Sequence, residues 1–182
     1  MSSSDLDVGP LDVSGTWYRH IPAFTPAVDP LWLPPDRTGE ARWQKNSVVF
    51  GLYVADSQET MWAEWYRSLA EAGLEPTEAV PREVWGFEVE LTVANLSTPK
   101  RLRRVGLPYP LSPDRNQWPR CQEIGHSLCR AGYAGLKAVS AARPTGRTLC
   151  LFRVTGDVPG LVQHTRLEVV DVPPAPPRGL RT

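Results

Sequence analysis

A strand that runs directly into a capped helix is the feature that most constrains the fold of this chain. Residues 47–55 read SVVFGLYVA, and such a run of β-branched and aromatic side chains is typical of a strand. The helix that follows should begin at Asp56 or Ser57, because Asp56 and Glu59 have the spacing of a capping box, and it should end at Gly73. The chain is therefore predicted to combine a sheet with helices.

Strands outnumber helices in the rest of the sequence. The other predicted strands are 15–21, 84–96, 147–154 and 161–172, with a strand or turn at 134–143 and a second helix at 121–132. This pattern favours a single α+β domain with a mixed or mainly antiparallel sheet. We place the domain at residues 13–172, between a disordered tail at 1–12 and a proline-rich tail at 173–182.

The composition excludes several classes of partner. The chain has 182 residues with 20 basic and 20 acidic side chains, so its formal net charge is zero. A neutral chain argues against nucleic acid or an anionic membrane as the main partner.

Three cysteines cannot all pair within one chain, which favours a reducing compartment. Neither a signal peptide nor an apolar run long enough to span a bilayer is visible. We therefore expect a soluble, cytoplasmic protein.

Two further patterns resemble functional sites, but neither predicts one. The run KRLRR at 100–104 is short, and in a neutral protein such a run is usually a solvated turn. Cys121, His126 and Cys129 lie close together in sequence, but their spacing lacks a tight pair of metal ligands. On a helix, the two cysteines are more often small core residues. No metal site is predicted.

A long irregular loop is predicted at residues 22–43, which hold five prolines. Loops of this length in compact domains are usually functional or disordered. Arg19 lies just before the loop and Arg42 lies near its end, where a guanidinium could bind a phosphate or a carboxylate through two hydrogen bonds. For either arginine alone, an ordinary surface position is the alternative.

Glu64 lies beside a broad apolar arc of the predicted helix. Large side chains with helical spacing form this arc: Met61, Trp62, Trp65, Tyr66 and Leu69. Glu64 falls just outside the arc, where a glutamate is usually a solvated surface residue. Periodicity alone therefore favours the surface and leaves a carboxylate held for chemistry as the alternative.

Several short motifs stand in an order that resembles the RES domain, a bacterial family named for an Arg, a Glu and a Ser. They read WYRHIPA, ARWQ, LYVADSQETMWAEW, WPRCQEIGHSL and GYAGLKAVSAAR, followed by LCLF, and they cover roughly residues 15–155. The motifs supply the residues Arg19, Arg42, Tyr53, Glu64 and Ser140. One motif departs from the family, which usually has two glycines before the arginine, whereas this chain reads Glu-Ala-Arg-Trp-Gln.

The resemblance implies a fold related to ADP-ribosyltransferases and a toxin that cleaves NAD at the nicotinamide–ribose bond. The ADP-ribose would pass to water, phosphate or a protein. NAD would be the substrate, with no cofactor. A proteinaceous antitoxin with a helix-turn-helix would restrain the toxin, and a homodimer stays open. The alternatives are a protein ADP-ribosyltransferase of the same fold and a non-catalytic NAD-binding or nucleotide-binding module.

The resemblance also assigns roles to the motif residues. Glu64 would stabilise the positive charge that develops on the ribose as the bond breaks, with Arg19 as the second catalytic residue. Arg19 and Arg42 would hold the pyrophosphate or an incoming phosphate. Tyr53 would stack on the nicotinamide ring or orient it, and Ser140 would hydrogen-bond the ligand. The loop at 22–43 is expected to form one wall of the site.

Overall fold

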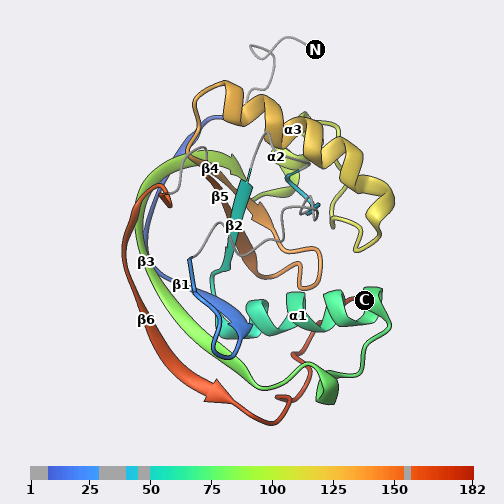
Figure 1. The fold of residues 1–182 in the computed structure, drawn as a ribbon. Helices are drawn as coiled ribbons and strands as arrows, with labels where there is room; N and C mark the ends of the chain where they lie inside the picture. The colour runs from blue at the N-terminus through green and yellow to red at the C-terminus, as the bar shows by residue number, and fades with distance from the viewer. Residues whose placement is uncertain (1–7, 29–39, 45–49, 154–156) are drawn as a thin grey trace.

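One curved sheet of six strands organises the chain (Figure 1). The computed structural model describes residues 8–28, 40–44, 50–153 and 157–182. The strands are β1 Pro10–Pro22, β2 Phe50–Ala55, β3 Arg82–Leu96, β4 Gly135–Val139, β5 Arg147–Arg153 and β6 Leu161–Val170. They lie in the order β1-β2-β5-β4-β3-β6, and of these neighbours within the described residues only β3 and β4 are parallel. The predicted α+β domain with a mixed sheet is confirmed.

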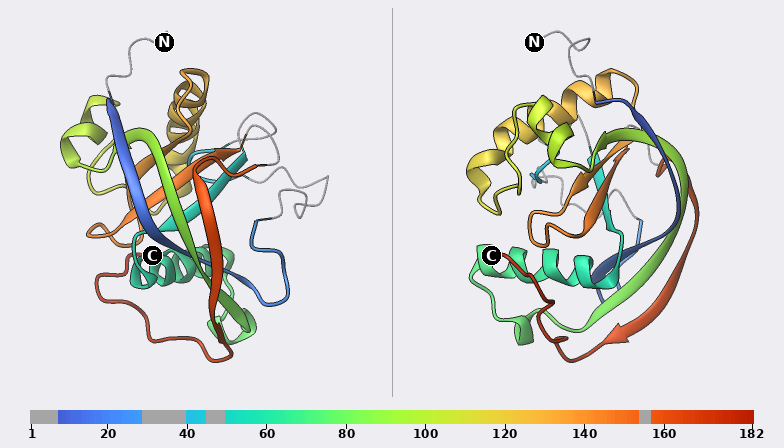
Figure 2. Two further views of the ribbon diagram at one scale, coloured as in Figure 1. Left: turned by 90° about the vertical axis from the view of Figure 1, so that its left-hand side faces the viewer. Right: turned by 180° about the vertical axis from the view of Figure 1, so that it is seen from behind.

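The sheet closes on itself because β1 has a second partner. β1 pairs with β3 from Pro10↔Ala94 to Pro22↔Arg82, in addition to its contact with β2. β6 lies on the outer side of β3, so that β1, β3 and β6 run as three long curved strands (Figure 2). The strong curvature leaves a concave face, which the helices cover.

Helices close the concave side of the sheet from two ends. They are α1 Gln58–Ala72, α2 Pro99–Arg104 and α3 Trp118–Arg130, with short 3-10 turns η3 Pro76–Glu78 and η4 Arg115–Gln117. In Figure 1, α2 and α3 lie above the sheet interior and α1 lies below it. No helix among the described residues is long and apolar enough to cross a membrane.

Three apolar clusters bind these layers together. One packs α2 and α3 on the sheet and includes Trp43, Leu111 and Ile124, and a second fills the curve of the sheet around Trp17 and Phe87. The third joins α1 to the sheet through Met61, Trp62, Trp65, Leu69, Ala55 and Val84. The apolar arc predicted from helical periodicity is thus the buried face of α1. Cys121 and Cys150 are buried in the first cluster.

The helix α1 begins and ends close to the predicted residues. Its N-cap is Ser57, whose hydroxyl accepts a hydrogen bond from the Thr60 amide at 3.2 Å. Asp56 does not cap the helix, because its carboxylate accepts from the Arg147 amide at 2.8 Å and so ties β5 to the helix start. Gly73 ends the helix with a φ of 65°, a left-handed conformation that glycine adopts without strain.

Two segments are more regular than predicted. β1 begins at Pro10, inside the expected tail at 1–12, because every residue from Pro10 onward has a partner on β3. Residues 1–7 lie outside the described residues. The basic run at 100–104 belongs to the helix α2, which Thr98 caps through the Arg101 amide at 3.3 Å. Within α2, the Leu102 side chain is fully buried, and its packing in the first apolar cluster holds the helix on the domain.

Candidate active site

A pocket of about 540 Å³ opens where β1 and β2 separate. The two strands share the register pair Tyr18↔Ala55, after which β1 follows β3 and β2 follows β5. Residues 18–22 of β1 and the whole of β2 line the pocket, together with side chains of α1. Residues 25–27 and 40–44, near the two ends of the proline-rich loop, also line it. Of the expected loop wall, residues 29–39 lie outside the described residues.

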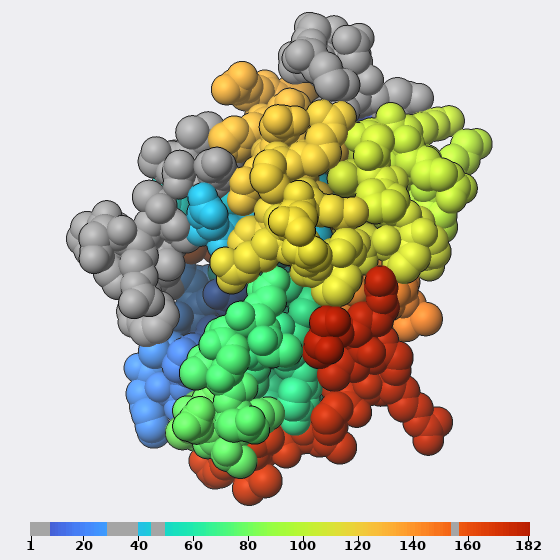
Figure 3. All heavy atoms as spheres, turned by 90° about the vertical axis from the view of Figure 1, so that its right-hand side faces the viewer, coloured from blue at the N-terminus to red at the C-terminus, as the bar shows by residue number. Residues whose placement is uncertain are grey.

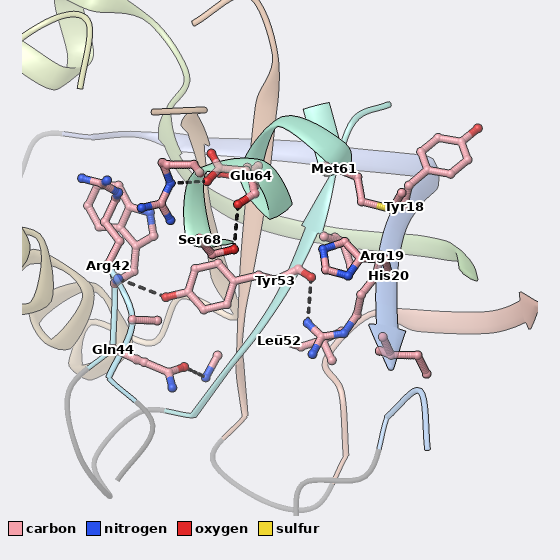
Figure 4. Close-up of a pocket in the computed structure, with 18 of the residues that line it drawn as sticks. Tyr18, Arg19, His20, Arg42, Gln44, Leu52, Tyr53, Met61, Glu64 and Ser68 are labelled. Atoms are coloured by element: carbon pink, nitrogen blue, oxygen red, sulfur yellow. Dashed lines mark hydrogen bonds and ion pairs between the residues drawn. The ribbon is translucent and has the colours of Figure 1, made fainter. Parts of the chain in front are cut away.

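Glu64 projects from α1 into this pocket (Figure 4), and both of its carboxylate oxygens are held. Oε1 accepts from the Ser140 hydroxyl at 2.7 Å and lies 3.4 Å from the Ala142 amide nitrogen. Oε2 accepts from Arg67 Nε at 3.0 Å. The side chain is 26% exposed, so the structure does not place it on an open helix surface. A carboxylate fixed in this way is oriented before any ligand arrives.

Ser140 lies behind Glu64 and not on the pocket surface. It follows β4, is 1% exposed, and does not line the pocket. Its hydroxyl donates to Glu64 and accepts from the Arg143 amide at 2.9 Å, so that its donor and one acceptor position are already used. The resemblance implied that Ser140 contacts the ligand, whereas this geometry makes it a residue that holds the carboxylate.

Tyr53 connects the two halves of the pocket. Its hydroxyl accepts from the Trp43 amide at 3.0 Å, and its main-chain carbonyl accepts from Arg19 Nη1 at 2.9 Å (Figure 4). Burial, and then the nearby Cys150 thiol, raise the pKa of Tyr53 well above its usual value, so the hydroxyl stays protonated. Tyr53 thereby fixes the loop that carries Arg42 relative to the strand that carries Arg19.

Arg19 and Arg42 present guanidinium groups with unused donors. Among the described residues, Arg19 Nε and Arg42 Nη1 are buried and have no hydrogen-bond partner. Arg42 is 8% exposed, and its Nη2 lies 3.5 Å from the Pro113 carbonyl. Burial lowers the pKa of Arg42; burial followed by the charge of Arg153 lowers the pKa of Arg19 to about 10. Both groups remain cations that an anionic ligand would stabilise.

Three further arginines, which the motifs do not include, line the pocket: Arg67, Arg82 and Arg153. The five arginines of the described lining face two glutamates, Glu40 and Glu64, although the chain as a whole is neutral. Burial and then Arg19 lower the pKa of Arg82 to about 10. Positive charge is therefore concentrated in the pocket, as a site for an anion requires. Of the three, only Arg67 was detectable from local sequence, since it lies one helical turn after Glu64.

His20 supports this cluster as a neutral ring. Arg82 Nη2 donates to its Nδ1 at 2.7 Å, and the ring stacks on Trp62 with 5.4 Å between centroids. Burial, followed by the charges of Arg82 and Arg19, lowers the pKa of His20 well below its usual value. The imidazole accepts a hydrogen bond and adds no charge to a pocket that already holds five arginines.

The comparison with known families agrees with the motifs. The family model described as the RES domain matches residues 16–172. This chain belongs to the RES domain family. The match contains every motif residue that the sequence supplied, and four of them, Arg19, Arg42, Tyr53 and Glu64, line one pocket.

A solved structure has the same fold as this RES domain. It is the crystal structure of the M. tuberculosis MbcT–MbcA toxin–antitoxin complex, of which the toxin chain matches with a TM-score of 0.70 and 24% sequence identity. The match covers 91% of this chain and 91% of that chain. The two chains therefore share one α+β fold. No protein in the set of curated sequences matches this chain.

Proposed function

We propose that this RES domain is a toxin that cleaves NAD at the nicotinamide–ribose bond. The observation that carries the proposal is the fixed Glu64 carboxylate in a pocket otherwise rich in arginine. NAD needs both features, because its pyrophosphate is anionic while its scissile carbon becomes positive. The pocket volume, about 540 Å³, lies in the usual range for sites that bury small ligands.

The chemistry assigns one task to Glu64. When the bond between ribose C1′ and the nicotinamide ring nitrogen breaks, its electron pair leaves with nicotinamide, which becomes neutral. The ribose is left as an oxocarbenium-like cation, and a fixed carboxylate stabilises it. The free lone pair of Oε2 can also accept from a ribose hydroxyl. An acceptor, either water or phosphate, then bonds to C1′, and water gives up a proton in doing so.

The surrounding residues bind and orient the substrate. Arg19 and Arg42 each have a buried N–H group without a hydrogen-bond partner among the described residues. Such donors suit the pyrophosphate or an incoming phosphate. The Tyr53 ring is fixed because its hydroxyl is bound to Trp43, so it can stack on nicotinamide without losing side-chain freedom. Ser140 and Arg67 hold the Glu64 carboxylate in place.

Nicotinamide release by the purified protein tests the reaction. Release that needs phosphate would identify a phosphorylase, and release without phosphate a glycohydrolase. Radiolabel transferred from NAD to a protein would identify the ADP-ribosyltransferase alternative. NAD binding measured by calorimetry without any release would identify a non-catalytic binding module. If the protein neither binds nor cleaves NAD, the proposed function is wrong.

A partner follows from the same proposal. An enzyme that consumes NAD in the cytoplasm harms its own cell, and a chain of this fold was crystallised in a toxin–antitoxin complex. We therefore expect a proteinaceous antitoxin, with a helix-turn-helix, that covers the pocket mouth. Expression of the active protein alone should lower cellular NAD and stop growth, and co-expression of the antitoxin should restore both. Normal growth with unchanged NAD would contradict the toxin role.

A further inference from the structure

Residues 173–182 run from the end of β6 back to the region behind Glu64. Figure 3 shows this segment, in red, lying between α1 and the lobe formed by α2 and the chain after it. The segment forms no helix or strand, as its prolines predict. It lies beyond residue 172, where the family match ends, and none of its residues lines the pocket.

The segment is bound to the turn that holds the Glu64 carboxylate. This turn, residues 140–146, is closed by the Ser140 amide donating to Gly146 at 3.1 Å and the Gly146 amide donating to Arg143 at 2.8 Å. The Arg181 amide donates to the Ala142 carbonyl at 2.8 Å. Ala142 thus lies between Glu64 and the C-terminal segment, with its amide nitrogen 3.4 Å from Glu64 Oε1.

The same segment also contacts the helix that carries Glu64. The Tyr66 hydroxyl, two residues after Glu64 on α1, donates to the Pro174 carbonyl. A third contact, from Arg181 Nη1 to the Leu111 carbonyl at 3.0 Å, anchors the segment on the opposite lobe. Residues 173–182 therefore connect α1, the turn and the lobe. Two of these elements set the position of the Glu64 carboxylate: α1 carries the side chain, and turn 140–146 holds it through Ser140.

We propose that residues 173–182 form a strap that positions Glu64 for catalysis. The inference rests on the proposed NAD cleavage. Without the strap, the outer side of turn 140–146 loses its hydrogen bond at Ala142, and Ser140 holds Glu64 less firmly. Small displacements of a catalytic group reduce turnover strongly, by up to about 100-fold for 1 Å. Substrate binding should change little, because the strap does not line the pocket.

A pair of variants at one residue tests the amide contact. Arg181→Pro removes the amide donor to Ala142, whereas Arg181→Ala keeps that amide and removes the contact with Leu111. Arg178→Ala, an exposed arginine of the same strap, is the control. We expect Arg181→Pro and deletion of 173–182 to lower kcat about 10-fold with KM for NAD within about twofold. Arg181→Ala should lower kcat less, and Arg178→Ala should match wild type.

Hydrogen exchange of residues 140–146, measured without NAD, tests the strap independently of the reaction. Faster exchange in Arg181→Pro and in the deletion, with an unchanged thermal midpoint for Arg181→Pro, supports the strap. Unchanged exchange overturns it, and so does faster exchange with unchanged kcat. An equal loss of kcat in Arg178→Ala would also overturn it. If wild type does not cleave NAD, the proposed function fails, while the exchange comparison still decides whether the strap holds the turn.

Discussion

At the scale of single residues, the environment of a side chain decides its chemistry more than its position along the helix. Glu64 and Glu71 both bind Arg67, through Nε at 3.0 Å and Nη1 at 2.9 Å. Only Glu64 lies in the described pocket lining and accepts from Ser140. Because both glutamates lie on α1 and bind the same arginine, they provide a matched test of what the pocket adds.

Glu64→Gln should abolish most of the turnover and leave folding and NAD affinity almost intact. Glutamine has nearly the same shape but no charge to oppose the oxocarbenium ion. Loss of one preorganised electrostatic contact typically costs about 10²–10³ in rate, or roughly 3–4 kcal/mol. NAD cleavage and NAD affinity should be measured for Glu64→Gln and for the control Glu71→Gln, which should keep its rate. A rate for Glu64→Gln within about threefold of wild type would remove Glu64 from the mechanism.

His20 should make stability sensitive to mild acid. Its folded-state pKa lies well below the unfolded value of about 6.5, so the unfolded chain binds the proton more readily. Its contribution to stability is therefore present above pH 6.5 and is lost as the pH falls below that value. His20→Asn keeps an acceptor near Arg82 but cannot titrate. The drop in thermal midpoint from about pH 7.5 to 5.5 should be smaller in His20→Asn than in wild type. Equal drops would contradict the assignment.

At the scale of elements, the position of Arg42 depends on how closely α3 packs against residues 40–44. A Cβ built on Gly125 of α3 would lie 2.1 Å from the Trp43 carbonyl oxygen. The Gln122 side chain donates to the Ala41 carbonyl at 3.1 Å in the same contact. The helix and the loop therefore touch through main chain, and the absence of a side chain at Gly125 allows it.

Gly125→Ala should displace the Arg42 loop. Alanine in a helix is usually about 1 kcal/mol more favourable than glycine, but here the methyl group meets a backbone oxygen. We expect a net loss of about 1–3 kcal/mol in unfolding free energy and a raised KM for NAD. Denaturant unfolding and NAD kinetics measure the two effects, with Ser127→Ala on the same helix as the control. A more stable protein with unchanged KM would show that the loop adapts freely.

At the scale of the whole molecule, a neutral chain concentrates positive charge in one pocket. The five arginines of the described lining come from β1, the loop at 40–44, α1, β3 and β5, so the cluster exists only in the folded protein. The prediction that nucleic acid is not the main partner rests on the overall charge of zero. A ligand in the pocket experiences the electrostatic field of the arginine cluster and not that of the neutral chain as a whole.

NAD binding should weaken as salt is added. Attraction between the pyrophosphate and the arginines is screened when the Debye length falls to about 3–4 Å near 0.5–1 M salt. We expect KM for NAD to rise several-fold between low salt and about 0.5 M, with kcat little changed. Product inhibition by nicotinamide, which carries no charge, is the internal control and should not change. A KM that is independent of salt would exclude the arginine cluster from substrate binding.

The sequence by itself determined most of the elements and the family, because the signals involved are local. β-branched runs, a helix cap at Asp56 or Ser57 and the stop at Gly73 act within a few residues, and the order of short motifs identified the RES domain and its candidate residues. Tertiary structure alone decided how those residues meet. Ser140 reaches Glu64 across 76 positions, Arg82 and Arg153 arrive from distant strands, and Arg181 reaches the turn at Ala142. Such contacts follow from the curvature of the sheet and the packing of its helices, which no local pattern encodes.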